Sequence, residues 1–414
     1  MTPSYSLTEQ LATHLQRPVD DATRARARLH LLDWLGCVAG ARQHLPLNNF
    51  RKRFDSFGEA ASLLGNVLEM DDVHKGAVLH PGPVVWGLCA QSHPNNMDEL
   101  LYMAVHGYEA MIAVGATLDE YHYAHWHPTA VAGGIGAAAA AARYFELDTS
   151  QTCWALANAA SVAGGLWHMR HDNALTKQWH VLHACRVGFD AAGAAAYGVT
   201  GSRFILEGPQ GLYAAMCRQP KPMTFPDHWR IHEVSFKPWG ACRHAHPAID
   251  AALELEAKLG HLDGDILVET YADAISFCDR PDPISVQDAK FSIQHAVAVV
   301  AQKGVPELAD FEADAIAQFA EARSRVTARE ASDITARYPE HYGARVTAGG
   351  QSVELTDTLG DPERPMSDEQ IIGKARALIA WGGLPPTEAD RAVDLALYGD
   401  DAGAIHTMLE DWLG

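Results

Sequence analysis

Residues 127–142 read HPTAVAGGIGAAAAAA, a histidine-proline turn followed by a long run of alanine and glycine. Small side chains bury little apolar area but let helix backbones approach closely, so this run predicts a helix packed inside a bundle. A second run rich in alanine and glycine lies at 155–166. The stretch at 130–142 is too short and too weakly apolar to hold a bilayer. The two runs therefore predict the centre of a helical domain.

The first half of the chain is predicted to be almost entirely helical. Across 7–201, segments with helical spacing of apolar residues alternate with short breaks. Leu29, Leu32 and Leu35 mark one such apolar face. The spacing gives no sign of a sheet in this half.

After Pro220 the pattern changes to a mixture of strands and helices. We expect a strand at 266–276 and a hairpin of 344–349 with 352–356, which closes around two adjacent glycines. Helical stretches are predicted near 247–259, 287–302 and 309–323. This part reads as a smaller α+β unit.

The expected fold class is mainly α with an α+β insertion, a large all-helical domain plus a smaller α+β lid domain. Residues 1–232 are the first part of the helical domain, and 233–358 form the smaller one. Residues 359–414 are predicted to return to the helical domain as two helices, at 367–382 and 387–412.

Charge and composition exclude several classes of protein. The 414 residues carry a formal net charge of −20, which disfavours binding to nucleic acid or anionic lipid. Seven scattered cysteines without a C-x-x-C pair argue against a disulfide framework, and the first residues lack the pattern of a secretory signal. A cytoplasmic protein without nucleic-acid or membrane partners is expected. Histidine is unusually frequent, with 22 residues against nine lysines.

Ionisable side chains gather in five short segments, most of them beside glycine or proline. The segments are 70–82, 121–129, 177–186, 236–247 and 289–295. In the third, the spacing of Lys177, His180 and His183 places all three on one helix face. Each segment also has a structural explanation, since His-Pro pairs cap turns and Asp71-Asp72 can cap a helix. Five such segments in one acidic chain nevertheless favour a functional site.

Two chemistries compete for these residues. A metal site would combine Asp71 or Asp72 with histidines, because imidazole and carboxylate suit Zn, Mn or Fe. The candidate ligands are His122, His125, His127, His180 and His183. The H-E-x-x-H motif is absent, and the spacing fits no known ligand set. The other chemistry removes a proton next to a carboxylate, which requires a base of matched pKa and fixed cations.

The same segments resemble the MmgE/PrpD family, and the resemblance covers almost the whole chain. It rests on six motifs in one order: Asp71-Asp72-Val73-His74 with His80-Pro81-Gly82, His127-Pro128-Thr129-Ala130, Lys177 with His180 and Ala184, Phe236-Lys237-Pro238-Trp239 with His246-Pro247-Ala248-Ile249-Asp250, Ala289-Lys290-Phe291-Ser292, and the closing Gly360-Asp361-Pro362 with Pro365.

The resemblance implies a helical domain, an α+β lid, a cleft between them, homodimerisation, and no metal or organic cofactor. It also assigns the site residues. The implied catalytic residues are His127, His80, Asp72 and Lys237. The implied substrate-binding residues are Asp71, Lys177, His180, Arg186, His246 and His295. Asp71 is an alternative to Asp72, and Lys177 is an alternative to Arg186.

Three departures from the family pattern bear on the substrate. His295 stands where family members often have tyrosine, and Val73 replaces the usual threonine. The stretch between Cys37 and Ala60 is shorter than is typical of the family. These differences permit a chemistry other than those already named in the family.

The sequence thus predicts a cofactor-independent lyase, a dehydratase or decarboxylase that acts on a small di- or tricarboxylate. Epimerisation of a dicarboxylate is the alternative, because it shares the carbanion-like intermediate. A metal-dependent hydrolase and a non-catalytic carboxylate-binding protein are the remaining alternatives.

Overall fold

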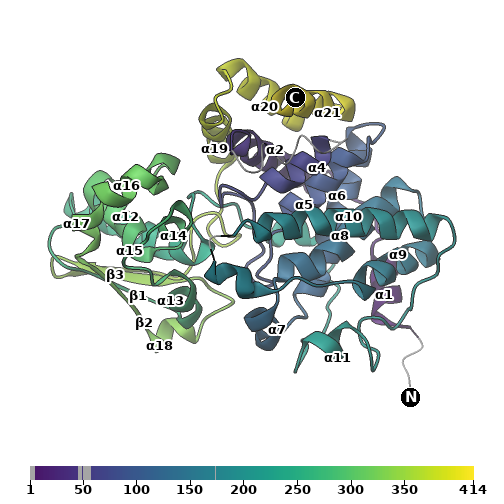
Figure 1. Cartoon of the computed structure of the whole chain (residues 1–414), viewed down its shortest axis with the longest axis horizontal. Helices are drawn as coiled ribbons and strands as arrows, with labels where there is room; N and C mark the ends of the chain where they lie inside the picture. The colour runs from purple at the N-terminus through teal and green to yellow at the C-terminus, as the bar shows by residue number, and fades with distance from the viewer. Residues whose placement is uncertain (1–4, 45–48, 50–56, 173) are drawn as a thin grey trace. The chain divides into compact units, whose positions relative to one another are not determined.

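The computed structural model describes residues 5–44, 49, 57–172 and 174–414 (Figure 1). The chain divides into two compact units. Unit 1 comprises Met1–Val67, Asp71–Val234 and Ser367–Gly414, and unit 2 comprises Leu68–Met70 and Ser235–Met366. Half of the stretch between Cys37 and Ala60, which was predicted to be short, lies outside the described residues, at 45–48 and 50–56. The predicted fold class, mainly α with a smaller α+β part, is confirmed.

The regular elements of unit 1 in its described residues are all helices. Its helices are α1 (Leu7–His14), α2 (Asp21–Ala41), α4 (Phe57–Leu64), α5 (Pro81–Gln91), α6 (Met97–Gly115), α7 (Glu120–His125), α8 (Pro128–Tyr144), α9 (Thr149–Ser161), η1 (Trp167–His171), α10 (Thr176–Ala196), α11 (Leu212–Met216), η2 (Arg230–Glu233), α19 (Asp368–Trp381), α20 (Pro386–Tyr398) and α21 (Ala402–Leu413). Within the described chain, no helix is long and apolar enough to cross a membrane.

The alanine- and glycine-rich helix α8 lies at the centre of unit 1, as its composition predicts. Every residue from Pro128 to Ala142 is buried, and α6 and α10 pack against it (Figure 1). A Cβ atom at Gly136 would lie 2.6 Å from the Cβ of Met111 on α6. A Cβ atom at Gly188 on α10 would lie 2.3 Å from the Cβ of Ala137. Because neither gap admits another carbon, glycine is required for this close packing.

The C-terminal helices belong to the same unit as the N-terminal ones. Helix α19 packs on α2, where the buried Lys374 Nζ lies 2.5 Å from Asp33 Oδ1. The single helix predicted for 387–412 is wrong in one respect, because the chain breaks after Tyr398 into α20 and α21. Asp401 accepts a hydrogen bond from the backbone of Gly403 and so starts a new helix.

Unit 2 contains a four-stranded sheet in the order β2-β1-β3-β4. Its strands are β1 (Ile266–Thr270), β2 (Val326–Glu330), β3 (Ala344–Ala348) and β4 (Gln351–Leu355). Strand β1 pairs in parallel with β2 and antiparallel with β3, and β3 and β4 form the predicted hairpin. The turn between β3 and β4 places Gly349 and Gly350 at positive φ, where side chains are strained.

The structure shortens one predicted strand and adds one that was not predicted. The chain leaves the sheet after Thr270 and forms a helix at Ala272–Cys278, whose buried residues Ala274 and Cys278 have helical spacing. Strand β2 was not expected, because only Val326 of its five residues is buried. An edge strand of this kind lacks the alternating pattern that marks a half-buried strand.

The helices of unit 2 are η3 (Arg243–Ala245), α12 (His246–Leu259), α13 (Ala272–Cys278), α14 (Val286–Lys290), α15 (Ile293–Lys303), η4 (Leu308–Phe311), α16 (Ala313–Gln318), α17 (Ala320–Arg323) and α18 (Ser332–Thr335). Helices α12 and α15 pack together and against the sheet (Figure 1).

The last turn before α19 belongs to unit 2, so the structure places this boundary at Ser367 rather than at 359. Asp361 in that turn pairs with Arg243 and accepts a hydrogen bond from Ser235.

Candidate active site

A tight loop returns the chain from Asp72 to His80. His74 and Leu79 exchange backbone hydrogen bonds of 2.9 and 3.4 Å. The His80 Nδ1 atom then lies 3.0 Å from the backbone oxygen of Asp72 and 2.9 Å from Asp71 Oδ2. Since both neighbours are acceptors, Nδ1 carries the proton, and in neutral His80 the other nitrogen, Nε2, is left as a base.

The Asp72 carboxylate is fully engaged inside unit 1. Its Oδ1 accepts a 2.8 Å bond from the backbone of Gly82, and its Oδ2 lies 2.5 Å from the Tyr108 hydroxyl and 2.8 Å from His30 Nδ1. Burial raises the pKa of Asp72 to about 6, although the bonds from Tyr108 and Gly82 favour its charged form. Asp72 therefore anchors the loop to the start of α5.

The partners Tyr108 and His30 were not predicted. Tyr108 lies on α6 and accepts a 3.0 Å bond from Trp86, and His30 lies on α2. Burial lowers the pKa of His30, with the charges of Arg26 and Lys374 acting in the same direction. In the sequence, each of these two residues is a single polar residue inside an apolar helical run, and this pattern does not identify its partner.

The Asp72 contact leaves no room for a side chain at Gly82. A Cβ atom there would lie 2.6 Å from Asp72 Oδ1. We expect Gly82→Ala to lower the free energy of unfolding by about 1–3 kcal/mol, because overpacking a buried contact displaces its neighbours. Urea denaturation measures this change. Gly76→Ala in the same loop is the matched control, since its Cβ would meet nothing closer than 3.5 Å; equal losses in both variants would contradict the explanation.

His127 is the residue immediately before α8 and is 1% exposed. Its backbone N–H donates a 2.9 Å bond to Gly165, and its Nδ1 lies 3.2 Å from Nδ1 of His180. The buried Nε2 atom has no hydrogen-bond partner among the described residues. Burial lowers the pKa of His127, and the charges of His180 and Lys177 lower it further. His127 is therefore a neutral imidazole at neutral pH.

Helices α5, α8 and α10 begin close to His127. The backbone N–H of His80, just before α5, donates a 3.0 Å bond to Thr129 in the first turn of α8. A Cβ atom at Gly133 of α8 would lie 2.9 Å from Ala184 of α10 and 3.4 Å from Val84 of α5. The helices thus start at the same end, and neither α8 nor α10 has a side-chain cap. The positive ends of their aligned dipoles favour an anion there.

Helix α10 brings Lys177 and His180 to this cluster but not Arg186. Nine residues separate Lys177 from Arg186, about two and a half helical turns, so the two side chains leave opposite faces. The Nε atom of Arg186 lies 2.5 Å from Glu59 on α4. Burial lowers the pKa of His180, and the charge of His183 adds to this effect.

The remaining predicted site residues belong to unit 2. Lys237 is fully buried, and its Nζ lies 3.5 Å from Oε2 of Glu69. Glu69 was not predicted, although it stands two residues before Asp71 and is itself 2% exposed. Its φ of 57° is rare for a residue with a side chain, so the fold holds this carboxylate in place at a cost.

His246 and His295 already use both ring nitrogens within unit 2. His246 Nε2 lies 3.0 Å from the oxygen of Ala241, and its Nδ1 lies 3.2 Å from Arg243. His295 Nε2 lies 2.7 Å from the oxygen of Asp310, and its Nδ1 lies 3.3 Å from Arg323. The predicted substrate contacts of these two histidines would require these bonds to break.

Comparison with known proteins identifies the family of the chain. Residues 58–224 match the MmgE/PrpD N-terminal domain, and residues 239–397 match the MmgE/PrpD C-terminal domain. The chain belongs to the MmgE/PrpD family. It is 26% identical over 277 residues to the cis-aconitate decarboxylase of Homo sapiens and 25% identical over 270 residues to that of Mus musculus. The matches cover 62% and 61% of this chain but only 57% and 55% of the relatives' own lengths.

Of the histidines considered for a metal site, His127 and His180 lie together in this MmgE/PrpD chain, whereas two others have different surroundings. His125 is exposed, and His122 is buried with its ring stacked on Trp126. Over the described ranges, the one group of three His, Cys, Asp or Glu residues with ligand atoms within 4.8 Å of one another is Asp357, Asp361 and Glu363. None of these three was a predicted ligand.

The buried His122 makes stability depend on pH. Burial lowers its pKa from 6.5 to about 4, so below pH 6.5 the unfolded chain binds a proton that the folded chain does not. This contribution to stability is lost as the pH falls from 6.5 to 4. His122→Phe should reduce the slope of unfolding free energy against pH there by roughly 1.4 kcal/mol per pH unit. Urea titrations at several pH values test this, with the exposed His125→Phe as control; an unchanged slope in His122→Phe contradicts it.

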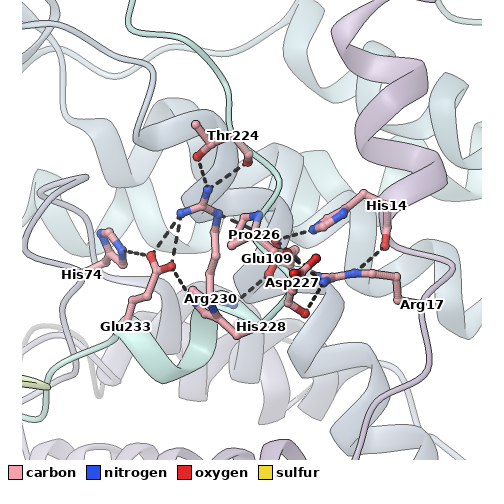
Figure 2. A network of polar contacts seen from close by, with 10 residues as sticks. All are labelled: His14, Arg17, His74, Glu109, Thr224, Pro226, Asp227, His228, Arg230 and Glu233. Atoms are coloured by element: carbon pink, nitrogen blue, oxygen red, sulfur yellow. Dashed lines mark hydrogen bonds and ion pairs between the residues drawn. The ribbon is translucent and has the colours of Figure 1, made fainter.

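A partly buried ionic network holds His74, in the loop between Asp72 and His80 (Figure 2). Glu233 accepts bonds of 2.9 Å from His74 and 2.7 Å from His228, and lies 3.1 Å from Arg230. Burial alone would raise the pKa of Glu233, but its bond to His74 and the nearby positive charges lower it to about 2. Figure 2 also shows Arg230 and the fully buried Glu109 linking this cluster to α1.

Proposed function

We propose that the protein is a cofactor-independent lyase that acts on a small di- or tricarboxylate by moving a proton at the carbon next to a carboxylate. The observation that carries this proposal is the meeting of His80, His127 and His180 with the starts of three helices. A neutral imidazole beside groups that favour an anion is what such a proton transfer requires.

We propose the following roles for these residues, on the basis of their contacts. His80 takes the proton through Nε2, because Asp71 and the backbone of Asp72 hold its Nδ1. His127 donates or accepts a second proton through its unpartnered Nε2. Lys177 and the uncapped helix starts bind a substrate carboxylate. Asp72 acts as a positioning residue, since both of its oxygens accept hydrogen bonds within unit 1. Lys237 of unit 2 provides a further cation.

The two related proteins are decarboxylases by name, which supports a lyase. In decarboxylation the carbon–carboxylate bond breaks, its electrons remain on carbon, and a histidine protonates that carbon. In dehydration a proton leaves carbon and hydroxide leaves its neighbour. Two histidines in one cluster also suit an epimerase, where one removes and the other returns a proton.

We further propose the homodimer and cytoplasmic location that the sequence predicts, and sedimentation velocity tests the dimer.

A panel of acids monitored by proton NMR in deuterated water tests the proposal. The panel holds methylcitrate, citrate, cis-aconitate and iminodisuccinate. A lyase changes the carbon skeleton or its unsaturation, whereas an epimerase introduces deuterium without release of water or carbon dioxide. If no acid reacts or exchanges a carbon-bound proton with the native enzyme, the proposed function is wrong.

A further inference from the structure

The segment that leads into α10 is strongly basic for an acidic chain. Between Gly165 and Phe189 the one acidic residue is Asp172. The basic and titratable residues of the same stretch are His168, Arg170, His171, Lys177, His180, His183 and Arg186. In a chain that carries −20, Arg170 and Lys177 on a stretch with a single carboxylate favour the binding of a small anion.

The start of this segment is fixed against His127. The His127 N–H donates to the Gly165 oxygen, and the Trp167 ring centroid lies 4.6 Å from that of His127. Gly165 has a φ of 131°, and a Cβ atom there would lie 2.5 Å from the Cβ of Ala130. The backbone therefore cannot easily shift, and helix η1 begins directly beside the proposed proton-transfer residue.

Helix η1 is a 3-10 helix, so side chains three residues apart lie on the same side of it. His168 and His171 fall on one side, in agreement with ring centroids 5.5 Å apart. Arg170 falls on the same side as Trp167, the residue that contacts His127. Arg170 Nε lies 3.4 Å from His171 Nε2, so the three basic residues form one cluster. No residue of η1 is buried.

We propose that Arg170, flanked by His168 and His171, binds a second carboxylate of the substrate. The inference rests on the proposed function, in which the first carboxylate lies at the starts of α8 and α10. A guanidinium group forms paired hydrogen bonds with a carboxylate, which a lone point charge does not. The buried Nε2 of His127 then faces a carbon between the two carboxylates. This subsite selects di- and tricarboxylates over monocarboxylates.

Binding of two unreactive acids tests the subsite directly. The probes are propane-1,2,3-tricarboxylate and the monoacid butyrate, titrated by ligand-observed NMR. Arg170→Gln should weaken the tricarboxylate about tenfold and leave butyrate unchanged, as expected for loss of one partly exposed charged pair. The affinity of Arg170→Lys for the tricarboxylate should lie between those of the native protein and of Arg170→Gln. Arg203→Gln, whose arginine pairs with Glu9, removes the same charge elsewhere in unit 1 and should change neither affinity.

The outcomes separate this inference from the proposed function. If Arg170→Gln binds the tricarboxylate as tightly as the native protein, or weakens butyrate or inorganic phosphate to the same extent, the subsite is wrong while the reaction stands. The proposed subsite is also wrong if a preparation of the native protein turns over a panel acid but does not bind the tricarboxylate. If no panel acid reacts but binding still depends on Arg170, the proposed reaction fails and the subsite is retained.

Discussion

Replacing His127 with glutamine is expected to lower turnover about a thousandfold, because a positioned acid or base accelerates proton transfer by roughly 100- to 10,000-fold. Glutamine keeps a polar group of similar reach but cannot take or give a proton near neutral pH. The buried Nε2 of the residue has no hydrogen-bond partner in the described part of the chain, so its loss should affect the reaction more than the fold. Turnover of the best panel acid, with the thermal unfolding midpoint of each variant, measures both.

The control for this variant lies two residues away. His125 is exposed, and its Nδ1 contacts the backbone oxygen of Tyr121. His125→Gln makes the same chemical change outside the His127 cluster and should leave turnover within about twofold of native, as is usual for a surface substitution. Near-native turnover in His127→Gln would remove this residue from the proposed mechanism.

Replacing Lys237 with methionine should lower turnover at least about a hundredfold, as loss of a fixed charge that stabilises a developing anion does. Methionine fills a similar volume but carries no charge. The single variant also removes a cation from beside the buried Glu69, which destabilises the fold. The double variant Lys237→Met with Glu69→Gln removes both charges, and its unfolding midpoint should recover while its turnover remains low.

A second lysine of unit 2 provides the comparison. Lys303 pairs with Glu307 and Asp310 on the outside of the unit. Lys303→Met should change turnover little, since its ammonium group serves an exposed ion pair. A well-folded double variant with native turnover would show that Lys237 is structural only.

The sequence alone determined the helical core and the places where helices begin. The run of alanine and glycine at 130–142 predicts close helix packing wherever it occurs, because only small residues let backbones approach. His80-Pro81 and His127-Pro128 mark helix starts, since proline fits the first turn of a helix. The two glycines of the hairpin mark its turn. All of these signals depend only on residues close together in the sequence, so they can be recognised without knowledge of the fold.

Only the tertiary structure decided what the motif residues do. Asp71 and Asp72 are neighbours in sequence, yet Asp71 contacts the His80 ring whereas the Asp72 carboxylate binds Tyr108 and the start of α5. Lys177 and Arg186 leave opposite faces of α10, and only the packing of the helix shows that the face of His180 meets His127 whereas Arg186 meets Glu59. Each of these roles comes from contacts between residues far apart in the chain, and no local pattern records which face of one helix meets which face of another.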